Sequence, residues 1–75
     1  MKAVKIKLSL AENVKTFVNI VSRYDYDIDL REGRHVVDAK SMMGIFSLNL
    51  AKPVTMEIYS DSCEGLMDDI RSFVV

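Results

Sequence analysis

Few side chains in this sequence could take part in chemistry, and they are scattered along the chain. The only histidine is His35 and the only cysteine is Cys63. No spacing places a nucleophile or a carboxylate beside either residue, so the sequence predicts no catalytic residue and no enzyme. We expect His35 to be a structural or surface residue and Cys63 to be a small packing residue.

Three carboxylates alternate along the segment that contains Asp25, Asp27 and Asp29. Carboxylates at this spacing could attract a metal ion, but the glycine and closing glutamate of a calcium loop do not follow. The spacing favours the solvated face of a strand. The sequence also has no glycine-rich phosphate loop and no Cys/His cluster, so we expect neither a metal nor a cofactor.

The segment Lys40–Leu50 has the most specific pattern. Ser41 is a good helix N-cap, and Ile45 and Leu48 follow at spacings that share one helical face. The other apolar side chains fall largely on a second face: Met42, Met43 and Phe46. In so small a protein, we expect this second face to bind a partner, because methionine is common on adaptable binding surfaces.

Composition limits the class of protein. The 75 residues are 49% hydrophobic and 28% charged with a net charge of −1, which predicts one globular domain spanning residues 1–75. The near-zero charge argues against nucleic-acid binding. No apolar run is long enough for a membrane helix, and Lys5 and Lys7 interrupt the first apolar stretch, which argues against a signal peptide. A single cysteine is consistent with a cytoplasmic location.

The first third of the sequence predicts a strand and a helix. Residues 4–8 alternate between apolar and basic side chains, which is typical of a half-buried strand. Ser9 and Glu12 have the spacing of a capping box, which predicts a helix over residues 11–24 with Ser9 as its N-cap. Apolar residues recur at helical spacing through this segment: Leu10, Val14, Phe17, Val18, Val21 and Tyr24.

The remainder predicts three strands and two helices. Alternating residues indicate strands at 26–30, 35–39 and 54–59, and the helix that starts after Ser41 lies between the last two. If the first and last strands are neighbours, Glu57 could pair with Lys5 or Lys7. Asp61 or Ser62 is expected to cap a last helix. The expected buried stripe of that helix is Leu66, Ile70, Phe73 and Val74.

These elements predict the order β-α-β-β-α-β-α. Each expected strand has one apolar face and one mostly polar face, which is typical of an antiparallel sheet with helices on one side and water on the other. The predicted fold class is therefore α+β, an open-faced sandwich with a four-stranded antiparallel sheet and three helices on one face.

Two segments resemble the HPr family, the phosphocarriers of the bacterial sugar phosphotransferase system. Residues 37–48 are similar to the regulatory-serine segment of that family, in which an apolar strand precedes Lys-Ser-(Ile/Met)-Met-Gly and a further apolar run. Residues 22–30 are similar to the segment that leaves its first helix. The resemblance runs from residue 22 to 51 without a gap, and it implies the same open-faced sandwich.

The resemblance is lost at the position of the phosphoryl-accepting histidine. HPr proteins carry Gly-(Ile/Leu)-His-Ala-Arg-Pro-Ala at the start of the first helix. The ungapped alignment places Leu10 at the histidine, Glu12 at the arginine and Asn13 at the proline. Leucine cannot accept a phosphoryl group and glutamate would repel one. The sequence therefore resembles members such as catabolite-repression HPr, which lack this histidine.

The regulatory serine is retained as Ser41. The resemblance implies that an ATP-dependent HPr kinase phosphorylates Ser41, whereas the residue pattern alone leaves Ser41 as either a switch or only a helix cap. It also implies partners in the phosphotransferase and catabolite-regulation network: a kinase, an enzyme I-like protein or a transcriptional regulator. The residues expected to contact them are Leu10, Lys40, Met42, Met43 and Phe46.

We therefore expect a regulatory, partner-binding module of carbon metabolism. One alternative is a genuine phosphocarrier with an atypical acceptor, for which only His35 is present. Another is an unrelated small α/β scaffold that forms a homodimer through its apolar patch. Loss of phosphoryl transfer in His35→Ala would support the first alternative, and a stable homodimer without affinity for phosphotransferase proteins would support the second.

Overall fold

The computed structural model describes residues 1–75 as one sheet with helices packed against it. The elements are, in chain order, β1 (Lys2–Ile6), α1 (Ala11–Val21), β2 (Ile28–Glu32), β3 (His35–Asp38), α2 (Met42–Phe46), β4 (Val54–Ile58), α3 (Glu64–Asp69) and a short 3-10 helix, η1 (Arg71–Phe73). The predicted order β-α-β-β-α-β-α is confirmed. None of the helices has the length and hydrophobicity needed to cross a bilayer.

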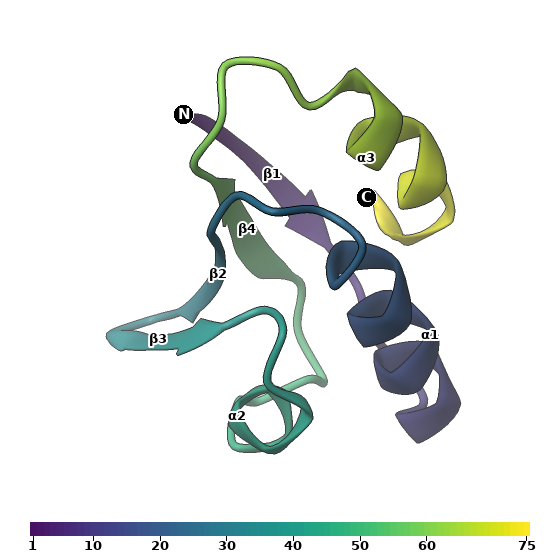
Figure 1. The fold of residues 1–75 in the computed structure, drawn as a ribbon. Coiled ribbons are helices and arrows are strands. Elements are labelled where there is room, and N and C mark those ends of the chain that lie inside the picture. The colour runs from purple at the N-terminus through teal and green to yellow at the C-terminus, as the bar shows by residue number, and fades with distance from the viewer.

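The four strands form a single antiparallel sheet in the order β1-β4-β2-β3. All three helices lie on the same side of this sheet (Figure 1). Alternation of side chains explains this arrangement, because β4 buries every second residue while the residues between them stay partly exposed. The predicted α+β open-faced sandwich is therefore confirmed, and the first and last strands, β1 and β4, are neighbours in the sheet.

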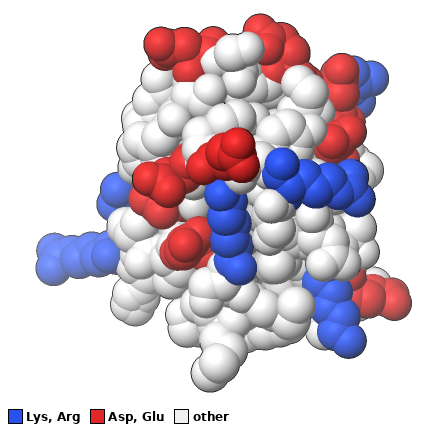
Figure 2. Space-filling model, viewed as in Figure 1, with Lys and Arg blue, Asp and Glu red and all other residues white.

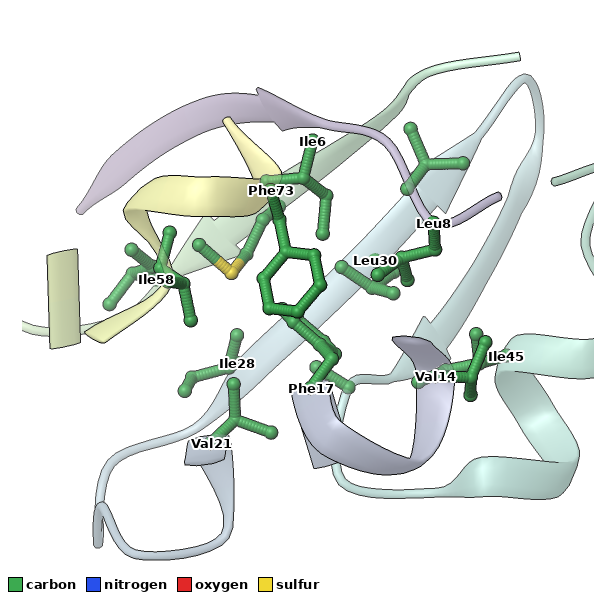
Figure 3. Close-up of a cluster of buried hydrophobic side chains, with 14 of the residues drawn as sticks. Ile6, Leu8, Val14, Phe17, Val21, Ile28, Leu30, Ile45, Ile58 and Phe73 are labelled. Carbon is green, nitrogen blue, oxygen red and sulfur yellow. The ribbon is translucent and has the colours of Figure 1, made fainter. Parts of the chain in front are cut away.

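The core lies between the sheet and the helices and contains no polar or charged residue. At its centre, the ring of Phe17 on α1 meets the ring of Phe73 on η1 edge to face, with 5.8 Å between the ring centroids (Figure 3). Val14 on α1 and Ile45 on α2 point toward each other at one end of the same cluster (Figure 3). Burial of each such side chain contributes roughly 1.5–3 kcal/mol, so this core fixes the positions of α1 and α2.

The predicted start of α1 at Ala11 is confirmed, but its predicted N-cap and its predicted end are wrong. Its N-cap is Leu10, which makes no side-chain capping bond, so Ser9 and Glu12 do not form a capping box. The helix ends at Val21 and not at Tyr24, because the N–H groups of residues 23 and 24 bond to the third residue before them and not to the fourth. For example, the Tyr24 N–H donates to the Val21 carbonyl at 3.2 Å.

The predicted start of the last helix is also wrong. The N-cap of α3 is Cys63, not Asp61 or Ser62, and the Ser62 hydroxyl instead donates to the Glu64 carboxylate at 3.1 Å. At the other end Val74 is exposed and not buried, because it leaves η1 and forms a bridge to Ile6 of β1.

The predicted ion pair of Glu57 with Lys5 or Lys7 is wrong as well. The register places Ala3 of β1 opposite Glu57, and Glu57 pairs with Arg31 of β2, with Nε and Oε2 3.3 Å apart. This pair raises the pKa of Arg31 through the hydrogen bond to Glu57. The Lys7 ammonium instead donates to the backbone carbonyls of the α2–β4 loop.

Candidate functional site

The short helix α2 begins as predicted, with Ser41 as its N-cap. The Ser41 hydroxyl accepts a hydrogen bond from the Gly44 N–H at 3.2 Å, which satisfies one of the unpaired donors of the first turn. Ile45 and Leu48 are buried, as their spacing predicted. The hydroxyl of Ser41 is therefore held at the N-terminus of α2, and one face of this helix is buried in the core.

Gly44 allows α2 to lie close to the sheet. A Cβ at this position would lie 3.2 Å from Cβ of Val37 on β3 and 3.3 Å from Oγ of Ser41. These distances are tighter than most contacts of real Cβ atoms. In the sequence, Gly44 stands out only as part of the pattern that resembles HPr, and its position three residues after the N-cap is the one signal that the helix needs a small residue there.

Two apolar side chains of α2 point into solvent. Met43 is 86% exposed and Phe46 is 48% exposed, whereas Met42 is half-buried and packs against the core. The surface over α2 carries few charged side chains, while acidic side chains gather near α3 (Figure 2). We call Met43 and Phe46 together the α2 surface. An uncharged surface with exposed apolar groups is the usual character of a protein-binding site.

The start of α1 lies at the same end of the molecule as α2, and the two helices are in contact (Figure 1). Leu10 is 58% exposed there, beside a hollow of about 430 Å³ that Ala11, Glu12 and Lys15 also line. The N–H groups of the first helical residues have no acceptor within the helix. An apolar side chain and a carboxylate therefore lie where these N–H groups face solvent.

Lys40 already has partners within the chain. Its ammonium donates to the backbone carbonyls of Tyr24 at 2.6 Å and Tyr26 at 3.0 Å, and so ties the α1–β2 loop to the residue before Ser41. Contact of Lys40 with another protein remains a prediction, and it would require the ammonium to leave these carbonyls. Sequence reasoning missed this internal role because the two loops are far apart along the chain.

The other chemically capable residues are dispersed. His35 is exposed on β3, at the opposite edge of the sheet from the strand that leads into α1. No group of three or more His, Cys, Asp or Glu side chains is arranged to hold a metal ion. Cys63 is buried and free. A hollow of about 460 Å³ beside it, not foreseen from the sequence, is lined by acidic residues that include Asp61 and Glu64.

Comparison with known proteins identifies the family. A family model described as the PTS HPr component phosphorylation site matches residues 9–74. No curated protein matches. Among solved structures, the chain is similar to HPr-C-His from Thermoanaerobacter tengcongensis, with 26% identity and a TM-score of 0.80 over 96% of this chain and 89% of the other. It is also similar to a phosphocarrier protein HPr from Bacillus anthracis str. Ames, with 27% identity and a TM-score of 0.73 over 99% of this chain and 94% of the other.

These matches confirm the family that the sequence resembles, so the alternative of an unrelated scaffold is wrong. The family match includes α1, α2 and the strands β2, β3 and β4, whereas β1 precedes the matched residues. Members of the family carry phosphoryl groups between proteins of the phosphotransferase system and are not catalysts. The chain belongs to the HPr family of the phosphotransferase system.

Proposed function

We propose that this protein is a regulatory, partner-binding member of the HPr family that does not carry phosphoryl groups on a histidine. In this proposal, proteins of the phosphotransferase and catabolite-regulation network dock on the α2 surface and on Leu10, in the cytoplasm, and phosphorylation of Ser41 switches that docking. The observation that carries the proposal is the exposure of Met43 and Phe46 directly after a serine that caps the same helix.

The residues at the start of α1 argue against phosphohistidine chemistry. The family match begins at residue 9, so the first turn of α1 falls within it, and the residue at the N-cap is Leu10. A leucine side chain has no atom that can accept a phosphoryl group. Glu12 in the same turn would repel the phosphate of a donor protein, since both groups are anionic.

The surroundings of Ser41 suit a phosphate. Its side chain is exposed, so a kinase can reach it without unfolding the helix. A phosphate there would lie near the free N–H groups at the start of α2, which favour negative charge, and no acidic residue lies in that first turn. A dianion beside the apolar α2 surface would change which partners bind, since charge at an apolar interface is costly to desolvate.

The proposal is tested first by phosphoryl transfer from phosphoenolpyruvate through enzyme I, followed by intact mass measurement. We expect no mass gain for the native chain and none for His35→Ala. A gain that disappears in His35→Ala would contradict the proposal and establish the atypical phosphocarrier. A working HPr in the same reaction shows that enzyme I is active.

A further inference from the structure

The two edges of the sheet differ in how their backbone groups are satisfied. The outer edge of β1 is covered by the last residues of the chain, since the Val75 N–H donates to the Lys5 carbonyl at 3.0 Å and the Lys7 N–H donates to the Phe73 carbonyl at 2.8 Å. No segment pairs with the outer edge of β3 (Figure 1). An open edge of this kind can accept another strand.

The backbone groups that point outward from β3 can be identified from its register. The Ala39 N–H donates inward to the Ile28 carbonyl at 2.9 Å. Residues of an antiparallel pair alternate between bonding to the partner strand and facing away from it, so the N–H and carbonyl of Val36 face outward, as does the N–H of Asp38. The Asp38 carbonyl is taken by the Ser41 N–H at 3.0 Å.

The charged side chains along this edge are arranged so that the edge of one copy is complementary in charge to the same edge of a second copy. Val36 and Asp38 of β3 and Arg34 of the turn before it are two residues apart, and all three are exposed, with Val36 at 43%. One oxygen of the Asp38 carboxylate accepts the Lys40 N–H at 2.8 Å, and the other oxygen has no hydrogen bond within the chain. The Arg34 guanidinium has no ion-pair partner within the chain. If two copies of this segment pair antiparallel around Val36, each Arg34 lies opposite an Asp38 and the two Val36 side chains face each other.

We propose that β3 pairs with β3 of a second copy of this chain, in antiparallel register around a two-fold axis through Val36. Each Val36 N–H would donate to the Val36 carbonyl of the other copy, and each Asp38 N–H to the Arg34 carbonyl. The two four-stranded sheets would become one continuous sheet. This inference concerns a different surface from the α2 surface and does not depend on the proposed function.

Charge favours this register over its neighbours. A shift of two residues in one direction places Glu32 opposite Asp38, and the same shift in the other direction places Arg34 opposite Lys40. Both shifts replace opposite charges by like charges, and a shift of one residue would turn every side chain to the other face of the sheet. A parallel pairing would align Arg34 with Arg34. Among these registers, only the one around Val36 brings opposite charges together at both ends.

Sedimentation of the full chain at concentrations up to about 1 mM tests the proposal. We expect the native chain to form dimers, and Arg34→Asp or Asp38→Arg alone to weaken the dimer about tenfold or more, because each reversal creates two pairs of like charges. An equimolar mixture of the two variants should recover association, since one chain then carries acidic and the other basic side chains at both ends. Recovery in the mixture also shows that both variants fold.

Val36→Pro is the matched backbone variant. Its N–H faces away from β2, so the proline removes a donor of the proposed dimer without removing a bond of the β2–β3 hairpin. We expect this variant to be monomeric with an unchanged circular dichroism spectrum. A native chain that stays monomeric overturns the proposal. The proposal is also overturned if the mixture of the two charge variants associates no more tightly than either variant alone. A dimer that survives Val36→Pro but is lost in Met43→Lys with Phe46→Lys would place the contact on the α2 surface and would likewise overturn it.

Discussion

The helices α1 and α2 begin at the same end of the molecule (Figure 1). Of these two helices, only α2 has a side chain that caps its first turn. In α2 the Ser41 hydroxyl accepts the Gly44 N–H, and no acidic residue lies in the first turn. In α1 the N-cap is Leu10, which makes no side-chain hydrogen bond, and Glu12 follows in the first turn.

This difference concerns two possible roles of a helix start, which are to receive a phosphoryl group and to carry a regulatory serine beside a docking surface. An uncapped helix start with free N–H groups could receive a phosphate, but Leu10 supplies no acceptor atom and Glu12 supplies the wrong charge. The start of α2 has a hydroxyl that a kinase could modify and exposed apolar residues next to it. On the proposal above, the start of α2 is a regulated docking site and the start of α1 is not a carrier site.

The largest effect should come from placing charge on the α2 surface. We expect Met43→Lys combined with Phe46→Lys to weaken binding of HPr kinase about 100-fold or more, because exposed apolar anchors carry most of the energy of such interfaces. Isothermal titration calorimetry measures this binding. Asn19→Lys combined with Ser22→Lys, two exposed positions at the far end of α1, adds the same charge and is the control, and equal losses in both double variants would mean that overall charge and not the α2 surface governs binding.

A smaller effect is expected from the serines that precede the two helices. Ser41→Ala should lower the free energy of unfolding by about 1 kcal/mol, because it removes the bond to the Gly44 N–H. Ser9→Ala should change it by less than about 0.5 kcal/mol, since Ser9 makes no capping bond in α1. Urea unfolding measures both values. Equal losses would mean that the capping box predicted from Ser9 and Glu12 forms in solution.

The missing cap of α1 can also be supplied. Leu10→Ser should raise the free energy of unfolding by roughly 0.5–1 kcal/mol, because the backbone at Leu10 already has the extended geometry of an N-cap and the leucine side chain is mostly exposed. The same urea experiment measures the gain. A loss of stability would show that Leu10 packs more closely than its 58% exposure indicates.

The smallest effect concerns the far end of α1 and should leave both helix starts unchanged. The Tyr24 hydroxyl donates to the Asp69 carboxylate at 2.6 Å, and this hydrogen bond raises the pKa of Tyr24 to about 12. The folded protein holds the proton more tightly than the unfolded chain, whose tyrosine pKa is 10.0. The contribution is therefore complete below pH 10 and is lost as the pH rises toward 12.

Thermal unfolding between pH 9 and pH 12 checks this prediction with Tyr24→Phe beside the native chain. We expect the native chain to lose stability more steeply with rising pH than the variant, because the variant has no proton to lose at this site. Parallel curves for the two proteins would mean that the bond to Asp69 does not form in solution.

Much of the fold could be predicted from periodicity, because each element buries one face. The spacing of Phe17 and Val21 identified α1, and the alternation of Val54, Met56 and Ile58 identified β4. The start of α1 at Ala11 could be predicted, but its N-cap could not. Ser9 and Glu12 satisfy the local capping pattern, yet the N-cap is Leu10, one residue after Ser9.

The site was predicted less completely than the fold. The pattern around Ser41 predicted the cap and the exposed α2 surface, because both depend on residues close in sequence. The partners of Lys40 and Glu57 could not be predicted, since they depend on strand register and on loops distant in sequence. The resemblance of residues 37–48 identified the family, although it covers only part of the chain.

The most direct test of the regulatory proposal is the intact mass of the purified protein after incubation with ATP and HPr kinase, beside Ser41→Ala. We predict that the native chain gains one phosphate and that Ser41→Ala gains none. A native chain that gains no phosphate, in a reaction where a working HPr does, would contradict the proposal and leave Ser41 as the cap of α2 alone.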